Sequence, residues 1–206
     1  VDDWIETYKR LTRWELELSG SDSNMSDMLT TQKNEANNGF GKFVKSHYMD
    51  WMDAIRSGSK ANRPLMSHDI FKTQIFPLLD QKQKVMLIVI DNLRYDQWRV
   101  LAEELGDMFD IEENLYTSIL PTATQYARNA IFSGLMPTQI QQMFPSLWVD
   151  EDEDEGKNLN EPELIRRQIE RYRRHDTFSY DKINDSQAAT KVFERRSEWS
   201  QHDLSV

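Results

Sequence analysis

An unbroken apolar run over residues 85–90 (Val-Met-Leu-Ile-Val-Ile) most constrains the fold of this 206-residue chain. The run is short, rich in β-branched residues and without polar–apolar alternation, which is typical of a strand buried on both faces of a parallel sheet. Asp91 follows the run directly. Because open α/β sheets bind ligands at the carboxyl ends of their strands, the sequence predicts a functional carboxylate at Asp91.

Residues 1–79 show helical patterns and no strand-like run. Apolar side chains recur every three or four residues over 3–18 and over 40–55, which predicts two amphipathic helices. The polar segment 19–39 between them predicts a loop that contains a short helix. Pro77 is expected to stop or kink a third helix near the end of this region.

The rest of the chain alternates between strand-like and helical patterns. After the apolar run, the expected elements are a helix over 95–105, a strand over 114–120, helices over 125–133, 137–144 and 160–174, a strand over 177–183 and a helix over 186–199. Such alternation implies a parallel, right-handed, layered sheet. We therefore expect an α/β domain over residues 80–206, with a helical connecting segment over 1–79 before it.

Composition excludes several kinds of protein. The net charge of −10 argues against a general binder of nucleic-acid backbones, although metal cations could reverse the local field for a phosphorylated substrate. The absence of cysteine excludes disulfides, thiolate zinc sites and cysteine nucleophiles, and it fits a reducing, cytoplasmic compartment. No apolar run reaches about 18 residues, so we expect no membrane span. The six acidic residues 150–155 are expected to form a solvated loop.

A second predicted strand end, at residues 120–124, carries a hydroxyl that could cooperate with Asp91. A threonine at the start of a helix lies near free backbone N–H groups, which favour a phosphoryl oxygen. A metal shared by Thr124 and Asp91 would lower the pKa of the hydroxyl and make it a nucleophile. Arg128, one helical turn later, could reach the same oxygens. Taken singly, each of the three residue types more often has an ordinary capping or ion-pairing role.

Three motifs together resemble the PglZ domain, a branch of the alkaline phosphatase superfamily. They are Val-Ile-Asp-Asn-Leu-Arg-Tyr-Asp at 89–96, Leu-Pro-Thr-Ala-Thr at 120–124 and Phe-Ser-Gly at 132–134. The resemblance implies an alkaline-phosphatase-like three-layer α/β/α fold with a parallel-rich sheet. It also implies a phosphoesterase that uses two metal ions, which we expect to be zinc.

The resemblance assigns roles to individual residues. Asp91 would be a metal ligand, and Thr124 would be both a metal ligand and the nucleophile. The superfamily places a glycine ten residues after its nucleophile, as Gly134 stands after Thr124. Thr122 remains the alternative nucleophile, with an interval of twelve residues. Arg128 corresponds to an arginine that the sulfatase branch carries four residues after its nucleophile.

The helix-rich start of the chain and the segment Asp-Ile-Phe-Lys-Thr-Gln-Ile-Phe-Pro-Leu-Leu-Asp at 69–80 resemble PorX-type response regulators of the type IX secretion system. These proteins place a receiver domain before a helical linker and a PglZ domain. The resemblance implies a phosphodiester or cyclic oligonucleotide substrate and homodimerisation. It also implies a sensor kinase that acts through the receiver domain, and a sigma factor or secretion-system component as partner. We expect this chain to hold the linker and the first part of the PglZ domain, without the receiver.

The superfamily has further metal ligands after its nucleophile. His175 and His202 each precede an aspartate, but we expect them to be structural, and the missing ligands are expected beyond Val206. The competing interpretation is that the chain has no catalytic role. In that case the fold would serve as a phospho-ligand sensor or as a dimerisation scaffold.

Overall fold

The structure is a computed structural model, and it describes residues 1–18, 23–59, 63–149 and 158–206. The acidic run 150–155 that was expected to be a loop lies outside the described residues. The chain divides into two compact units, Val1–Pro64 with Asn92–Leu115, and Leu65–Asp91 with Tyr116–Val206.

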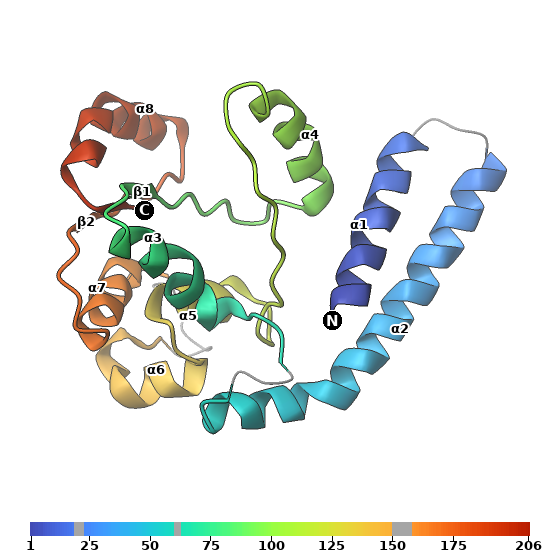
Figure 1. The fold of residues 1–206 in the computed structure, drawn as a ribbon, viewed down its shortest axis with the longest axis horizontal. Coiled ribbons are helices and arrows are strands. Elements are labelled where there is room, and N and C mark those ends of the chain that lie inside the picture. The colour runs from blue at the N-terminus through green and yellow to red at the C-terminus, as the bar shows by residue number, and fades with distance from the viewer. Residues whose placement is uncertain (19–22, 60–62, 150–157) are drawn as a thin grey trace. The chain divides into compact units, whose positions relative to one another are not determined.

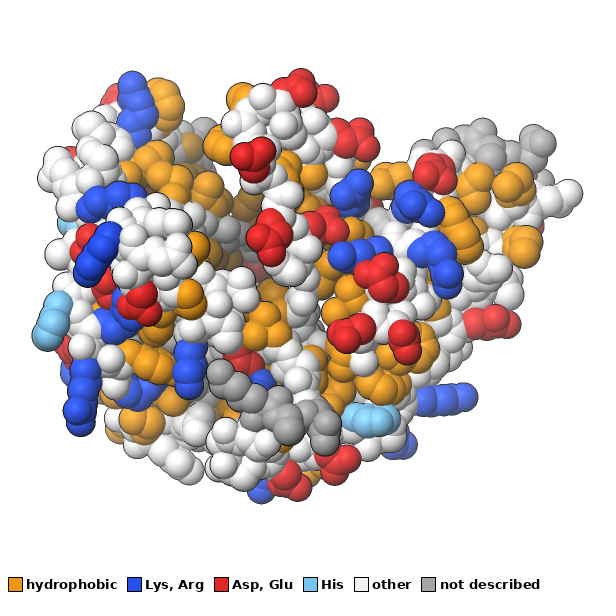
Figure 2. All heavy atoms as spheres, viewed as in Figure 1, with side chains coloured by type: hydrophobic (Ala, Val, Ile, Leu, Met, Phe, Trp, Pro, Cys, Tyr) orange, Lys and Arg blue, Asp and Glu red, His pale blue; other side chains and the backbone are white. Residues whose placement is uncertain are grey.

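The first unit is helical in its described residues. Its helices are α1 (Asp2–Glu17), α2 (Ser23–Arg56) and α4 (Tyr95–Leu105). Helices α1 and α2 lie side by side (Figure 1), and the Trp4 ring centroid lies 5.7 Å from that of Phe40 and 6.0 Å from that of Phe43. Figure 2 shows charged side chains of both signs interspersed with hydrophobic ones over these two helices. The predicted amphipathic helices are therefore present and pack through their aromatic faces.

Helix α2 corrects the prediction of a loop over residues 19–39. From Ser23 onward this polar segment is helical and continues without a break into the aromatic part. No proline interrupts it, and a helix that is already anchored extends at little cost per residue. Lys33, in the polar part, also forms an ion pair with Glu15 of α1. The polar residues therefore form a largely solvent-exposed stretch of helix.

Helix α4 is held within the first unit by contacts to the partly buried carboxylate of Glu113. The Tyr95 hydroxyl and the Trp98 indole N–H donate to this carboxylate at 2.7 and 3.1 Å. Lys9 of α1 lies 3.5 Å from the same carboxylate. Burial and the hydrogen bond to Glu113 raise the pKa of Tyr95 to about 12. Tyr95, although part of the first family motif, thus has a structural role.

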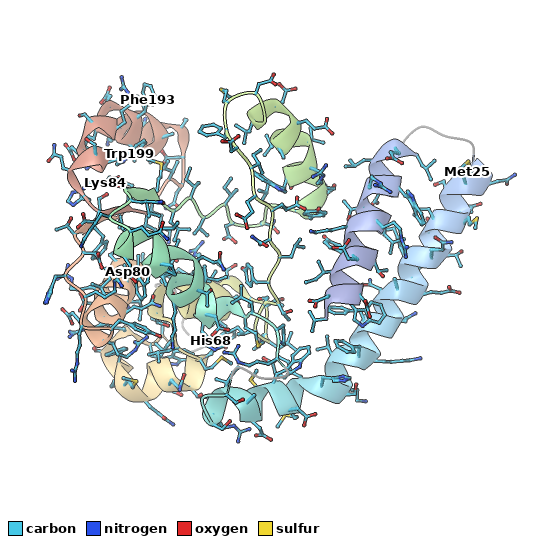
Figure 3. All side chains as sticks on the ribbon, viewed as in Figure 1. Met25, His68, Asp80, Lys84, Phe193 and Trp199 are labelled. Atoms are coloured by element: carbon cyan, nitrogen blue, oxygen red, sulfur yellow. The ribbon has the colours of Figure 1, made fainter. Side chains whose placement is uncertain are left out.

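The second unit combines short helices with a small sheet. Its helical segments are η1 (Ser67–Asp69), η2 (Phe71–Ile75), α3 (Phe76–Asp80), α5 (Thr124–Ser133), α6 (Pro137–Met143), η3 (Pro145–Leu147), α7 (Glu161–Arg171), α8 (Ser186–Glu194) and η4 (Arg196–Gln201). Helix α5 packs against α7, and the apolar core includes the buried side chains of Phe71, Phe132 and Leu164. In Figure 3, Phe193 marks α8 and His68 marks the start of the helical segment that leads to Asp80.

The sheet has three parallel strands of two residues each, in the order β1-β3-β2. The strands are β1 (Val85–Met86), β2 (Phe178–Ser179) and β3 (Leu204–Ser205). Leu204 of the middle strand is fully buried. The expectation of a mixed α/β fold with a parallel sheet is therefore confirmed, for a sheet of three short strands in the described residues.

The prediction that residues 85–90 form a strand buried on both faces is wrong. Only the first two residues are strand, and Ile88 and Ile90 are 70% and 57% exposed. The last ladder hydrogen bond runs from the Leu87 N–H to the Ser205 carbonyl, 2.8 Å away. The predicted strand over 114–120 is likewise reduced to one bridge, between Thr117 and Met66. A strand requires a neighbour along its length, and the described residues supply none beyond these points.

Most predicted helices are confirmed with small shifts of their ends. Helices α4, α5, α6 and α7 lie where the apolar spacing placed them. Pro77 does not stop its helix, which continues to Asp80, but the turn that precedes α3 is the π-helical η2 and not regular α-helix. The helix predicted over 186–199 divides into α8 and η4, and the strand predicted over 177–183 shortens to β2.

Candidate functional site

The structure brings Asp91 and Thr124 together. Thr124 is the first residue of α5, and Ala123 is the N-cap. The Thr124 hydroxyl therefore does not cap the helix, whereas the predicted helix over 125–133 put Thr124 at its N-cap position. It lies 3.5 Å from Oδ1 of Asp91, at the long limit for a hydrogen bond. An alcohol and a carboxylate from two separate segments thus share one place in the second unit.

Arg128 completes this group one helical turn along α5. Its Nη1 lies 3.1 Å from Oδ2 of Asp91, so both carboxylate oxygens of Asp91 have a partner. The Arg128 side chain is 15% exposed, whereas that of Asp91 is 56% exposed. The cation is therefore largely withdrawn from solvent, while the carboxylate it contacts remains accessible. Thr122, the alternative nucleophile, is exposed and makes no hydrogen bond to Asp91 in the described structure.

Glu161, which belongs to none of the three motifs, forms a hydrogen-bonded ion pair with Arg128. It is the first residue of α7 and is 1% exposed. Its carboxylate accepts hydrogen bonds from Arg128 Nε, from the Tyr180 hydroxyl and from Lys182 Nζ, the last at 3.2 Å. Burial, together with the hydrogen bond to Glu161, raises the pKa of Tyr180 well above its ordinary range.

The Asp91–Thr124 pair fits part of a metal site. Two oxygens that each lie about 2.1 Å from a tetrahedral zinc ion are about 3.4 Å apart, close to the separation found here. Carboxylate and hydroxyl oxygens also suit hard divalent cations. A cluster of three or more His, Asp or Glu side chains able to hold a metal is not found among the described residues. The described residues therefore bring together two candidate oxygen donors.

The two histidines after Thr124 do not join this pair. His175 is exposed, next to the Arg174–Asp176 ion pair, and His202 lies between η4 and β3, followed by Asp203. Asp203 accepts hydrogen bonds from the backbone N–H and the hydroxyl of Thr177, at 2.8 and 2.9 Å. This aspartate is thus engaged in joining β2 to β3.

The Phe-Ser-Gly motif forms the end of α5. Gly134 has φ +62° and caps the helix in the left-handed conformation. Arg171 of α7 donates to the Ser133 carbonyl at 2.6 Å, a favourable place for a cation at a helix C-terminus. Burial lowers the pKa of Arg171. The motif thereby fixes the far end of the helix that carries Thr124.

None of the helices that the structure describes combines the length and the apolar character needed to cross a bilayer.

Two family models match the chain. Residues 1–52 match the PorX response regulator linker domain, and residues 70–197 match the BREX system PglZ alkaline phosphatase-like domain. No curated protein matches the chain. The second match covers more than half of the 206 residues and includes the three motifs together with Asp91, Thr124 and Arg128. The chain therefore belongs to the PglZ alkaline phosphatase-like family, and it carries a PorX-type linker segment ahead of that domain.

Proposed function

We propose that this chain forms part of a metal-dependent phosphoesterase that serves as the output of a response regulator. One observation carries the proposal, which is the approach of the Thr124 hydroxyl to within 3.5 Å of the Asp91 carboxylate. The hydroxyl is not used as a helix cap and the carboxylate is accessible to solvent. Both groups are therefore available for chemistry.

Each residue has a distinct role in the proposed reaction. Asp91 and Thr124 would hold zinc, which when bound supplies the positive charge that activates a hydroxyl for attack. The Thr124 oxygen forms a bond to phosphorus and the ester oxygen leaves, taking the hydroxyl proton to become an alcohol. A water oxygen then bonds to phosphorus and displaces the Thr124 oxygen, which regains a proton from that water as the phosphate product leaves. The free N–H groups of the first turn of α5 and the Arg128 guanidinium hydrogen-bond the remaining phosphoryl oxygens.

Family membership supports the more specific parts of this proposal. We infer a phosphodiester substrate such as a cyclic oligonucleotide, a pair of zinc ions, and a three-layer α/β/α domain. The matched linker supports a cytoplasmic regulator of type IX secretion that is controlled by a sensor kinase, acts on a sigma factor or secretion component, and forms a homodimer. We place the linker at residues 1–79 and the PglZ portion at 80–206, an order that the two matches support.

Turnover of bis(p-nitrophenyl) phosphate by the full-length protein, with zinc added, tests the proposed reaction. We expect wild type to release p-nitrophenol, the Thr124→Val variant to lose this activity, and the Thr122→Val variant to keep it. Valine matches the shape of threonine and replaces only its hydroxyl, by a methyl group. Loss of activity in Thr122→Val alone would transfer the nucleophile role to Thr122.

Zinc binding measured on the same proteins separates an enzyme from a sensor. If wild type binds zinc and phosphate but does not hydrolyse the ester, the non-catalytic sensor or scaffold is the better description. If wild type binds neither zinc nor phosphate, the proposed function is wrong.

A further inference from the structure

Arg128 makes two kinds of contact through opposite parts of its guanidinium. Nε donates to the buried Glu161, whereas Nη1 contacts the accessible Asp91 at 3.1 Å. The guanidinium is planar, so fixing its Nε edge restricts where its Nη atoms can point. The hydrogen bond to the buried Glu161 therefore determines where Nη1 points, and so where it contacts the exposed Asp91.

The surroundings of Glu161 hold its carboxylate in place. Oε1 accepts from Arg128, and Oε2 accepts from both Tyr180 and Lys182. These partners come from α5 and from the segment that follows β2, while Glu161 itself begins α7. Three donors and the positive end of the α7 dipole compensate for burial of the charge.

Formal charge also favours a positioning role. Asp91 and Glu161 contribute two negative charges, and Arg128 and Lys182 contribute two positive charges, so the cluster is neutral as it stands. Lys182 is further held by the Asn158 carbonyl at 2.9 Å. If a cation or a phosphoryl group changes the charge at Asp91, Arg128 still has its buried partner and is kept beside the site.

We propose that Glu161 is a positioning residue: it anchors Arg128 through Nε, so that the Nη atoms remain directed at the Asp91–Thr124 pair. This inference rests on the proposed function, because it assumes that Arg128 serves a phosphoryl group. Glu161 itself does not contact the substrate. Tyr180 and Lys182 hold the Glu161 carboxylate in turn.

The Arg128 Nε–H resonance in the NMR spectrum tests the anchor without any ligand. The resonance is assigned by its loss in Arg128→Lys. In Glu161→Gln we expect its exchange with water to accelerate by roughly tenfold or more, because a charge-assisted hydrogen bond is lost. In Asp91→Asn we expect little change. Unchanged exchange in Glu161→Gln, or acceleration in Asp91→Asn alone, would overturn the inference.

Phosphate binding in the presence of zinc tests the consequence. We expect Glu161→Gln to weaken phosphate binding by about tenfold while zinc affinity stays within about threefold of wild type. Adding Glu161→Gln to Arg128→Lys should weaken phosphate binding little further, because Glu161 acts on phosphate only through Arg128. Additive losses would assign Glu161 a separate, purely structural role.

Two further variants keep the test decisive. Glu163→Gln, on the same helix, removes a carboxylate that pairs at the surface with Arg166 and Arg167, and it should leave both readouts unchanged. Should Glu161→Gln not fold, Glu161→Asp keeps the charge but withdraws it by one methylene, and we expect the same faster exchange. If wild type binds no phosphate, the proposed function fails, and the Nε–H comparison alone still decides whether Glu161 anchors Arg128.

Discussion

The hydroxyl of Thr124 lies 3.5 Å from a carboxylate oxygen of Asp91, although 33 residues separate the two in the chain. The contact joins the segment that follows β1 to the first turn of α5. It places two hard oxygen donors at a separation that suits one divalent cation.

Replacing Asp91 by asparagine should weaken zinc binding by at least about tenfold, because a charged ligand is lost. Titration calorimetry or competition with a chelator measures this directly. Asp96→Asn is the matched control, since Asp96 pairs with Arg94 and not with the site. Equal zinc affinity in wild type and Asp91→Asn would exclude Asp91 as a ligand.

Replacing Arg128 by glutamine should have the opposite effect on zinc. Arg128 lies 3.1 Å from Oδ2 of Asp91 and competes with an incoming cation for that carboxylate. Removing a competing ion pair worth up to about 1 kcal/mol should strengthen zinc binding by roughly fivefold. Arg94→Gln, with the same change in net charge, should have no such effect. Weaker zinc binding in Arg128→Gln would mean that the guanidinium supports the metal site.

Gly134→Ala should destabilise the second unit strongly. Gly134 has φ +62°, and a Cβ there would lie 2.2 Å from Gln168 Nε2. Gly58→Ala is the matched control, since Gly58 has φ +70° and open space around it. We expect about 1 kcal/mol for the control from backbone strain alone, and at least about 2 kcal/mol for Gly134→Ala. Urea denaturation measures both, and equal losses would show that the α7 side chains move aside.

Ile88→Ser should cost less than about 0.5 kcal/mol, because the side chain is 70% exposed. Ile165→Ser, at a fully buried position of α7, should cost at least about 2 kcal/mol. Chemical denaturation of the two variants tests whether the apolar run belongs to the core. A large loss in Ile88→Ser would restore the expectation of a buried strand.

Acid should weaken the connection between β2 and β3 through Asp203. Hydrogen bonds from the Thr177 backbone and hydroxyl, together with Lys84, hold the pKa of Asp203 below its ordinary value of 3.8. The pKa of Asp203 is lower in the folded than in the unfolded protein. The stabilisation by ionised Asp203 is therefore complete at a pH above the unfolded-state pKa, and it is lost as the pH falls through the folded-state pKa. Asp203 is largely solvated, so the effect is below about 1 kcal/mol. The stability difference between wild type and Asp203→Asn should therefore vanish at acidic pH well below 3.8.

The local parts of this molecule could be predicted from its sequence. Helix α5 and its glycine cap follow from apolar spacing and from Gly134, which are signals contained in adjacent residues. The approach of Asp91 to Thr124 was also expected, although from strand ends that the structure does not form. Their proximity depends on the segments leading out of β1 and into α5.

The non-local parts could not be predicted. Burial of residues 85–90 depends on neighbouring strands, which no property of the run itself specifies. Glu161 and Glu163 are both acidic residues of the first turn of α7, yet only Glu161 is buried against Arg128. That difference arises from the packing of α7 on α5. Because the two helices are distant in the chain, the pattern within either one does not predict which of its residues face the other.

The sheet order has a consequence for how the protein acquires its shape during synthesis. β3 is the last of the three strands to leave the ribosome, yet both β1 and β2 are hydrogen-bonded to it. Until residues 204–205 have been made, the strand that precedes Asp91 has no ladder to join. Co-translational folding can therefore prepare the helices, but alignment of Asp91 with α5 must wait for the third strand to arrive.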